Sequence, residues 1–107
     1  MKRIAQLVGL RPEKREEYLR LHAAVWPGVE ARLSASNISN YSIFLFGDQL
    51  MSYFEYLGDD FEADMALIAA DPETREWWSH TDPCQVSLPG TPEGAIWATA
   101  DEVWHLA

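Results

Sequence analysis

Cysteine and long apolar runs are the two features that this sequence has least of. Cys84 is the only cysteine in the 107 residues, so no intrachain disulfide can form. The apolar run within Met1–Leu10 is too short for a secretory signal peptide, and no small-residue cleavage site follows it. No segment approaches the roughly 18 apolar residues of a membrane span. We therefore expect a soluble, cytoplasmic protein.

Basic residues are also scarce. The chain has 8 Lys and Arg against 17 Asp and Glu, a formal net charge of −9. Binding to a phosphate backbone requires clustered Lys and Arg, so this balance argues against a nucleic-acid partner. The chain also has no glycine-rich dinucleotide motif, no P-loop and no Gly-x-Ser-x-Gly motif. A neutral or cationic small ligand suits such a composition better than a polyanion.

Apolar side chains, in contrast, are plentiful. Hydrophobic residues make up 48% of the chain and aromatic residues 12%, which is enough to build a core. The length corresponds to one domain, residues 1–107. A chain of this size buries only roughly two-thirds of the surface of its unfolded form, so a partner subunit would add useful burial.

The first third of the chain predicts a strand followed by a helix. Lys2–Leu10 alternates loosely between polar and apolar residues, which is typical of a strand. Pro12 suits the first position of a helix. Helical spacing then places six residues on one face: Tyr18, Leu21, His22, Val25, Val29 and Leu33. Pro27 should bend or interrupt this helix, because proline lacks a backbone donor and clashes with the preceding turn.

The middle of the chain predicts a β-hairpin. Tyr41–Leu57 contains two strand-like runs around Gly47 and Asp48, a turn-forming pair. In the first run one face carries Tyr41, Ile43 and Leu45, and the other carries Ser42, Phe44 and Phe46.

The remaining segments complete a β-α-β-β-α-β order. Phe61–Ala70 predicts a helix, and Asp71 and Pro72 suit the cap and first position of another. Thr81–Gly94 is rich in Pro and Gly and predicts a long ordered loop or a lid, while Glu102–Leu106 predicts a closing strand. This order is the ferredoxin-like α+β pattern with an antiparallel sheet.

A ferredoxin-like sheet has helices on one face only. Large side chains on the bare face need a cover, and candidates for one face or the other are Phe44, Phe46, Phe54 and Tyr56. Packing two such sheets together is the expected solution, so we expect a homodimer.

His22 is the first candidate for chemistry. A histidine on an apolar stripe is more often a structural core residue than a functional one. Tyr18 lies one turn earlier, so the two polar tips converge on one spot, where they can handle a proton and a hydroxyl together. Histidine can donate and accept a proton near neutral pH. Burial would lower the pKa of His22, so an acid at this position needs a hydrogen-bond acceptor beside it.

Trp77 and Trp78 are the second candidate. Neighbouring helical residues point about 100° apart, so we expect one indole in the core and the other at the edge of a pocket. The alternative is that both tryptophans pack in the core and neither contacts a ligand. Flat aromatic faces with polar groups at their rims suit a ligand with C–H faces and hydroxyls, such as a sugar.

The other histidines and the cysteine are weaker candidates. His80 is expected to be an exposed histidine at a helix end, and His105 to be structural or at the dimer edge. His22, His80 and His105 have no recognisable zinc-ligand spacing, so we expect no metal site. Cys84 as a nucleophile has no supporting motif.

Five short stretches follow one another in a familiar order. They are Tyr18-x-x-x-His22-x-x-x-Trp26-Pro27, Asn40–Leu45, Trp77-Trp78, Asp82–Gln85 and Glu102–Leu106. Together they resemble the L-rhamnose mutarotases over essentially the whole chain. Three positions depart from that family: Gly28 stands where many relatives have Glu, Trp104 replaces the usual Phe, and Ala107 ends the chain where an acidic residue is common.

The resemblance implies a dimeric, ferredoxin-like α/β-barrel enzyme that interconverts the α and β anomers of L-rhamnose. It implies that His22 is the proton donor. It also implies that the sugar-contacting residues are Tyr18, Tyr41, Trp77 and Trp78. The reaction opens the ring by protonating the ring oxygen while the anomeric hydroxyl loses its proton, and it needs no cofactor or metal. We expect Tyr18 to orient His22 or the sugar; the partner base stays open between water, a carboxylate and a backbone carbonyl.

Several alternatives remain open from the sequence. The substrate could be another 6-deoxy sugar such as L-fucose, or the protein could be a sugar-binding dimer that does no chemistry. The same fold also hosts cofactor-free and haem-handling oxygenases. A purely structural dimer is disfavoured by the inward-facing Tyr18 and His22. The Thr81–Gly94 loop could close the pocket of its own subunit or of the neighbouring one.

Overall fold

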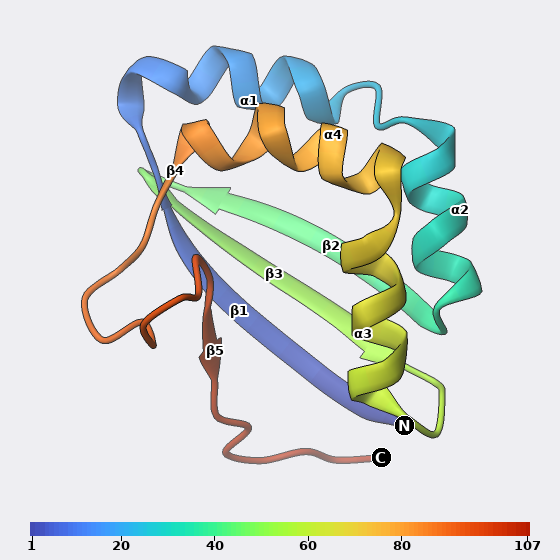
Figure 1. Ribbon diagram of the computed structural model, residues 1–107. Coiled ribbons are helices and arrows are strands. Elements are labelled where there is room, and N and C mark those ends of the chain that lie inside the picture. Colours follow the sequence, from blue (N-terminus) through green and yellow to red (C-terminus); the bar gives the residue numbers. More distant parts are fainter.

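The computed structural model describes residues 1–107 as one antiparallel sheet with helices on one face (Figure 1). The strands are β1 (Lys2–Leu10), β2 (Ile38–Phe46), β3 (Gln49–Tyr56), β4 (Gln85–Val86) and β5 (Ala98–Ala100). The helices are α1 (Arg15–His22), α2 (Pro27–Ala35), α3 (Phe61–Ala70) and α4 (Pro72–Thr81), with short 3-10 turns at Pro12–Lys14 and Asp82–Cys84. None of these helices is long and apolar enough to cross a membrane.

The strand order is β2-β3-β1-β4, and β5 also pairs with β1. All pairings are antiparallel. This order confirms the predicted ferredoxin-like α+β fold. The strand Lys2–Leu10 and the helix Phe61–Ala70 have the bounds expected from the sequence.

Pro27 interrupts the first helical segment, as predicted. Helix α1 ends at His22, Trp26 adopts an extended backbone (φ −65°, ψ 131°), and α2 begins at Pro27. A residue before proline is pushed out of the helical region, and proline itself fits the first helical position. The break lets α2 turn away from α1 (Figure 1), so that His22 lies at the end of one helix instead of in the middle of a longer one.

Asp71 caps α4 as expected. Its Oδ2 accepts hydrogen bonds from the backbone N–H of Thr74 (2.9 Å) and from the Thr74 hydroxyl (2.8 Å). These bonds hold the pKa of the Asp71 carboxyl below its usual value, because they stabilise the charged form. The cap sets the start of the helix that carries Trp77 and Trp78.

The predicted hairpin is present as β2 and β3. Gly47 has φ 61°, the left-handed conformation that glycine adopts without strain in a tight turn. Phe44 and Phe46 point away from the helices and are 56% and 78% exposed, whereas Phe54 and Tyr56 are buried beneath them. The bare face of the sheet therefore carries large apolar side chains, and Phe54 and Tyr56 belong to the covered face.

The buried apolar side chains form two clusters. One contains Val8, Leu10, Tyr18, Leu50 and Cys84, and the other contains Ile38, Phe54, Tyr56 and Ile68. Members of both clusters line hollows under the helices, so the core leaves room for a ligand.

The predicted closing strand at Glu102–Leu106 is wrong: these residues form no strand, and β4 and β5 take the edge of β1 instead. Pairing stops at Ala100, opposite Ala5, although β1 continues along this edge as far as Lys2. The last contact along this line is the ion pair between Arg3 Nε and Glu102 Oε1, at 2.6 Å.

The segment Thr81–Gly94 is more structured than predicted at its start. It begins with the last residue of α4, a 3-10 turn and β4, and only the following residues form a loop, beside β1 (Figure 1). Glycine at position 9 permits the close approach of β4, because a Cβ there would overlap Val86. Gly94, together with Ile96 and Trp97 just after it, lines a cavity of its own subunit.

Candidate active site

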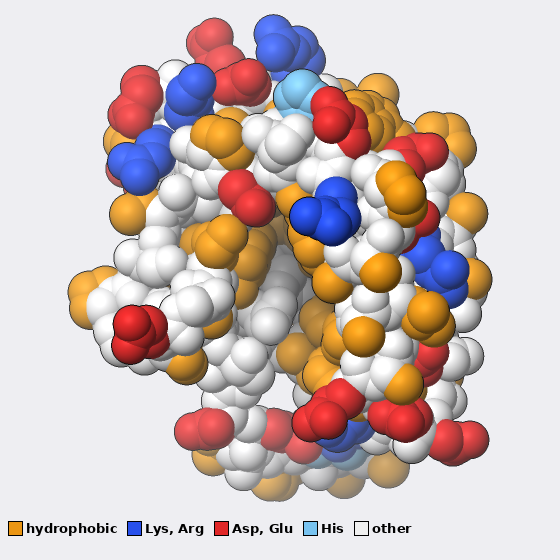
Figure 2. All heavy atoms as spheres, in the orientation of Figure 1, with side chains coloured by type: hydrophobic (Ala, Val, Ile, Leu, Met, Phe, Trp, Pro, Cys, Tyr) orange, Lys and Arg blue, Asp and Glu red, His pale blue; other side chains and the backbone are white.

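Two adjoining cavities lie between the helices and the covered face of the sheet. Their volumes are about 840 Å³ and about 510 Å³, within the size range of small-molecule sites. They share six lining residues: Gln6, His22, Tyr41, Ile43, Trp77 and Trp78. Figure 2 shows the surface hollowed between the loop that follows β4 and helix α3. Five site residues are predicted from the sequence, and four of them line both cavities: His22, Tyr41, Trp77 and Trp78. The fifth, Tyr18, lines only the smaller cavity.

His22 lies at the C-terminal end of α1 and lines both cavities. Its Nδ1 is 2.9 Å from the carbonyl oxygen of Tyr18. A carbonyl oxygen can only accept, so Nδ1 carries the proton and donates. Nε2 therefore has no intramolecular partner and is the ring nitrogen available to a ligand. The acceptor that the sequence required beside His22 is the backbone of its own helix.

Burial of His22 lowers the pKa of its imidazole, and the hydrogen bond to the Tyr18 carbonyl opposes that shift. Burial disfavours the charged ring, whereas an acceptor at Nδ1 stabilises it. Because burial dominates, most His22 side chains are neutral at pH 7. The imidazole can then gain a proton at Nε2 and pass it on.

Aromatic rings hold the His22 imidazole in place. It stacks on the Tyr18 ring with 4.1 Å between centroids and an interplanar angle of 25°, and it meets the edge of the Trp77 indole at 5.3 Å. Trp77 in turn contacts Trp26 at 5.3 Å. These contacts restrict the ring to one orientation, which is what a positioned proton carrier requires.

Tyr18 is buried, and its burial raises the pKa of the phenol well above its usual value. The amide of Gln85 beside it acts in the opposite direction, but the effect of burial is larger. The phenol therefore keeps its proton at physiological pH and can donate a hydrogen bond without acting as a base.

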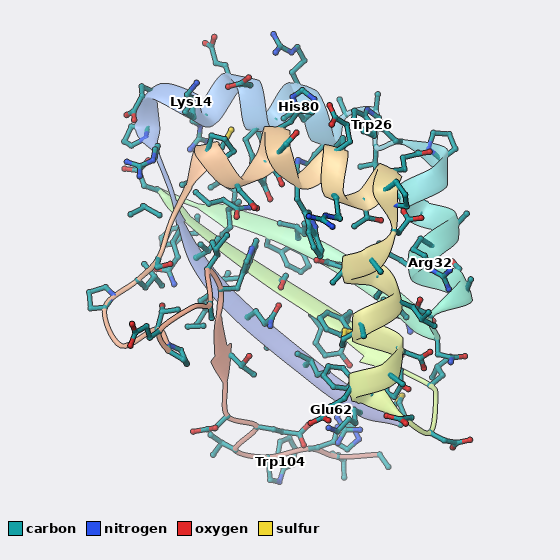
Figure 3. The ribbon with its side chains drawn as sticks, in the orientation of Figure 1. Lys14, Trp26, Arg32, Glu62, His80 and Trp104 are labelled. Atoms are coloured by element: carbon teal, nitrogen blue, oxygen red, sulfur yellow. The ribbon has the colours of Figure 1, made fainter.

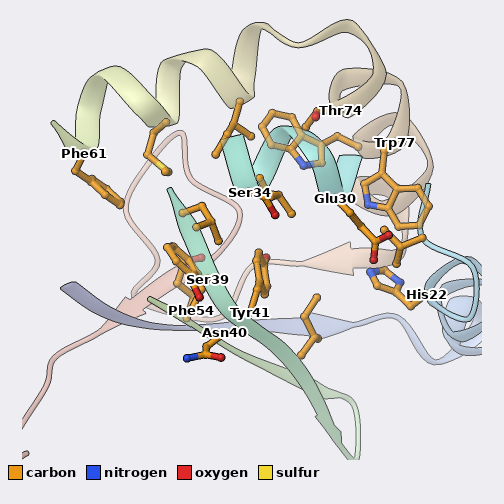
Figure 4. A pocket seen from close by; sticks show the side chains of 18 residues that line it. His22, Glu30, Ser34, Ser39, Asn40, Tyr41, Phe54, Phe61, Thr74 and Trp77 are labelled. Atoms are coloured by element: carbon orange, nitrogen blue, oxygen red, sulfur yellow. The ribbon is translucent and has the colours of Figure 1, made fainter. Parts of the chain in front are cut away.

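A β-bulge aims Tyr41 into the cavities. The register between β2 and β3 shifts between Ser39 and Ser42, where β2 contains one extra residue, and Asn40 has φ 50°. Side chains alternate along a strand, so Tyr41 would lie on the face opposite to Ile38 without the extra residue. The bulge instead turns Tyr41 toward the helices (Figure 4), and Tyr41 and Ile43 both line the cavities. Desolvation of the Tyr41 phenol raises its pKa, although 42% of the residue is exposed.

Trp77 and Trp78 take the two positions expected from the sequence, one in the core and one at the edge of a pocket. Trp77 is 6% exposed and packs in the interior, whereas Trp78 is 38% exposed at the rim. Both nevertheless line both cavities. The adjacent indoles thus form part of the wall and part of the entrance.

Sequence reasoning missed several polar lining residues. Glu30 of α2 lines the larger cavity, and Figure 4 places it with His22 and Trp77 at one end. Asp82 and Gln85 line the smaller cavity, and burial raises the pKa of the Asp82 carboxyl. No motif marks Glu30. Asp82 and Gln85 belong to one of the stretches that carry the family resemblance, but nothing in that stretch indicates that their side chains line a cavity, which depends on how distant segments pack.

The weaker candidates lie outside the cavity linings. His80 is exposed on α4, where its ring lies 5.8 Å from Trp26 and its Nε2 lies 3.6 Å from Glu76 (Figure 3). Cys84 is fully buried, and its burial raises the pKa of its thiol, which makes it a poor nucleophile. His105 lies in the exposed C-terminal residues. No cluster of three or more His, Cys, Asp or Glu side chains has a geometry suited to a metal ion.

Comparison with known proteins identifies the family. The sequence model of the family described as L-rhamnose mutarotase matches residues 3–106. The chain belongs to the L-rhamnose mutarotase family. An L-rhamnose mutarotase of Listeria monocytogenes serotype 4b (strain F2365) is 33% identical over 107 residues, with 100% of both chains covered. One from Lactiplantibacillus plantarum is 35% identical over 109 residues, with 99% of each covered.

Solved structures agree on the fold. The L-rhamnose mutarotase of Formosa agariphila superposes with a TM-score of 0.78 at 20% identity, and 100% of each chain is covered. Tetracenomycin F2 cyclase from Streptomyces glaucescens superposes with a TM-score of 0.73 at 16% identity, over 100% of this chain and 98% of the other. The fold is therefore shared by proteins with different names, and the L-rhamnose mutarotase assignment rests on the sequence match.

One departure from the L-rhamnose mutarotase pattern has a structural explanation. A Cβ at Gly28 would overlap the carboxylate of Glu73, which reaches across from α4 to the first turn of α2. A carboxylate at this end of a helix is stabilised by the helix dipole. Glu73 therefore places negative charge beside the first turn of α2, in the space that a side chain at position 28 would need.

Proposed function

We propose that this protein interconverts the α and β anomers of L-rhamnose by opening and closing the sugar ring, with His22 as the proton donor. The observation that carries the role of His22 is that its Nδ1 donates to the Tyr18 carbonyl oxygen, which leaves Nε2 free in an aromatic-walled cavity. Membership of the L-rhamnose mutarotase family favours this sugar over L-fucose, and favours catalysis over binding alone.

In the proposed reaction protonated His22 donates the Nε2 proton to the ring oxygen. The bond between that oxygen and the anomeric carbon breaks, and a base removes the proton of the anomeric hydroxyl as the aldehyde forms. Rotation about the adjacent C–C bond exposes the other carbonyl face. Ring closure then returns the proton from the ring hydroxyl to His22 and reprotonates the anomeric oxygen. General acid–base catalysis of this kind contributes about 10²–10⁴-fold.

The partner base can be water, a backbone carbonyl or a carboxylate. The cavity linings offer two carboxylates, Glu30 and Asp82. Tyr18 does not suit this role, because burial raises the pKa of its phenol. We assign Tyr18 to orienting His22 or the sugar. The stacking of the Tyr18 ring on the His22 imidazole supports the first of these roles.

The proposed sugar contacts are Tyr18, Tyr41, Trp77 and Trp78. Each lines at least one of the two cavities. L-Rhamnose carries a methyl group and C–H faces that suit the indole rings, and hydroxyls that suit the two phenols. The proposed reaction uses no cofactor or metal.

Exchange NMR tests the function directly. Saturating the anomeric proton of one form and observing the other measures the rate of interconversion, and L-fucose and D-glucose serve as comparison sugars. We expect the protein to accelerate exchange of L-rhamnose most. Sugar binding without faster exchange would instead identify a binding protein.

We also propose that residues 1–107 form one domain that assembles as a homodimer. The bare sheet face exposes Phe44, Phe46 and Met51, and the C-terminal tail exposes Val103 (94%) and Trp104, which projects away from the sheet (Figure 3). Apolar surface of this kind favours an interface with a second copy. Light scattering would distinguish a dimer from the 12.2 kDa protomer.

A cytoplasmic location completes the proposal. Cys84 is a free thiol in a buried position, which is compatible with a reducing compartment. Fractionation of cells that express the protein, followed by immunoblotting, tests this location.

A further inference from the structure

Two buried side-chain atoms have no hydrogen-bond partner: the amide oxygen Oε1 of Gln85 and the hydroxyl oxygen of Ser52. Gln85 is only 8% exposed, so its amide lies largely away from bulk solvent. Leaving a buried carbonyl oxygen unpaired disfavours the folded state. An unpaired polar atom in the wall of a ligand cavity therefore requires an explanation.

The backbone holds Gln85 firmly in place. It is the first residue of β4, opposite Leu10 of β1, and it follows the 3-10 turn Asp82–Cys84. The carbonyl oxygen of Cys84 accepts a hydrogen bond from the backbone N–H of Arg11 at 2.8 Å. Because strand and turn fix the backbone on both sides, the amide is presented in a defined position.

That position is in the proposed sugar site. Gln85 lines the smaller cavity together with Tyr18, His22 and Trp97. Its amide also lies beside the Tyr18 phenol, where it lowers the phenol's pKa as an N–H donor would. With the nitrogen end of the amide toward Tyr18, the oxygen end is left to accept from another donor.

We propose that Gln85 Oε1 accepts a hydrogen bond from a hydroxyl of the bound sugar, which makes Gln85 a specificity-determining residue. This inference rests on the proposed mutarotase function. A neutral amide oxygen is too weak a base to remove the anomeric proton, so Gln85 binds the sugar and takes no part in proton transfer. A site built to pair with a hydroxyl discriminates strongly against a sugar that lacks it.

The test replaces Gln85 with methionine (Gln85→Met), which keeps the length of the side chain and removes the amide. We expect the apparent KM for L-rhamnose to rise about tenfold while kcat stays within about twofold, since one hydrogen bond to a buried acceptor is lost. Thermal stability should be unchanged or higher, because the unpaired oxygen is gone. A fall in thermal stability without a rise in KM would show a structural role and overturn the inference.

Ser52→Ala is the matched control. Ser52 also has a buried oxygen without a partner, but it lines neither of the two cavities. Its replacement should leave KM unchanged. Equal effects of the two substitutions on KM would overturn the role of Gln85.

Monodeoxy analogues of L-rhamnose identify the hydroxyl. One analogue should bind the unsubstituted protein about tenfold more weakly and bind Gln85→Met with the same affinity, because the partner hydroxyl is absent from both complexes. If Gln85→Met weakens binding of every analogue equally, the proposed hydrogen bond does not exist. This comparison requires no assumption about which ring position is involved.

A measurement on the unsubstituted protein keeps the inference testable if Gln85→Met does not fold. The side-chain amide NMR signals of Gln85 should shift on saturation with L-rhamnose and should not shift with the analogue identified above. Unchanged signals with L-rhamnose would overturn the inference. Absence of anomer exchange in the unsubstituted protein would overturn the proposed function itself, which is a separate result.

Discussion

Replacing His22 with alanine tests the central chemical proposal. His22→Ala removes the only imidazole that lines the cavities, and with it the proposed general acid. We expect kcat for anomer exchange to fall by about 10²–10⁴-fold, the usual contribution of general acid–base catalysis. Binding should change less, because the aromatic walls and the other polar lining residues remain.

The structure indicates that His22→Ala should still fold. The substitution removes one hydrogen bond to the Tyr18 carbonyl, worth about 1 kcal/mol, and two ring contacts, with Tyr18 and Trp77, worth about 0.5–1.5 kcal/mol each. The total cost is about 2–4 kcal/mol, below the roughly 5–15 kcal/mol by which small domains are stable. A large loss of exchange with an intact fold would therefore report on chemistry.

The pH dependence of anomer exchange is a second test of His22 as the general acid. Burial lowers the pKa of His22 below its usual 6.5, so the protonated form grows as the pH falls from 8 toward 6. If His22 is the acid, enzymatic exchange should rise over this range, after the exchange in buffer alone is subtracted. The same rise should be absent from His22→Ala.

The assay is saturation-transfer NMR on both anomeric protons, with circular dichroism to verify folding. His80→Ala is the matched control, since His80 is an exposed histidine outside both cavities. It should exchange the sugar like the unsubstituted protein. Folded His22→Ala that exchanges at the unsubstituted rate would refute the assignment of the acid.

Three further predictions follow from the fold and the site. Asp71→Ala should lower the free energy of unfolding by about 1–2 kcal/mol in urea titration, because the α4 cap is lost and the buried Thr74 hydroxyl loses its acceptor; an unchanged midpoint would contradict the cap. Phe46→Lys should convert the proposed dimer to a monomer in light scattering, because it places a charge on the bare sheet face; a persistent dimer would locate the interface elsewhere. Trp78→Ala should weaken sugar binding by about tenfold in fluorescence or NMR titration, because stacking surface at the rim is removed; unaltered affinity would exclude Trp78 from the site.

Local sequence rules predicted much of the scaffold and the first part of the site. Pro27 ends one helix and begins another because of its own ring geometry, and Asp71 caps a helix through bonds to a residue only three positions away. Tyr18 and His22 meet because an i, i+4 spacing brings two residues together on any α-helix. These relationships require no knowledge of the rest of the chain.

Tertiary structure decided what depends on distant partners. Residues 85–86 and 98–100 pair with the edge of β1, whereas the strand-like pattern in Glu102–Leu106 forms no strand although Lys2–Ile4 are unpaired on that edge. A bulge against β3 turns Tyr41 into the cavity, and the packing of β4 on β1 brings Gln85 beside Tyr18. Periodicity and capping act over a few residues and can be read along the chain, whereas strand register and the lining of a cavity arise only when segments far apart in sequence compete for the same neighbours.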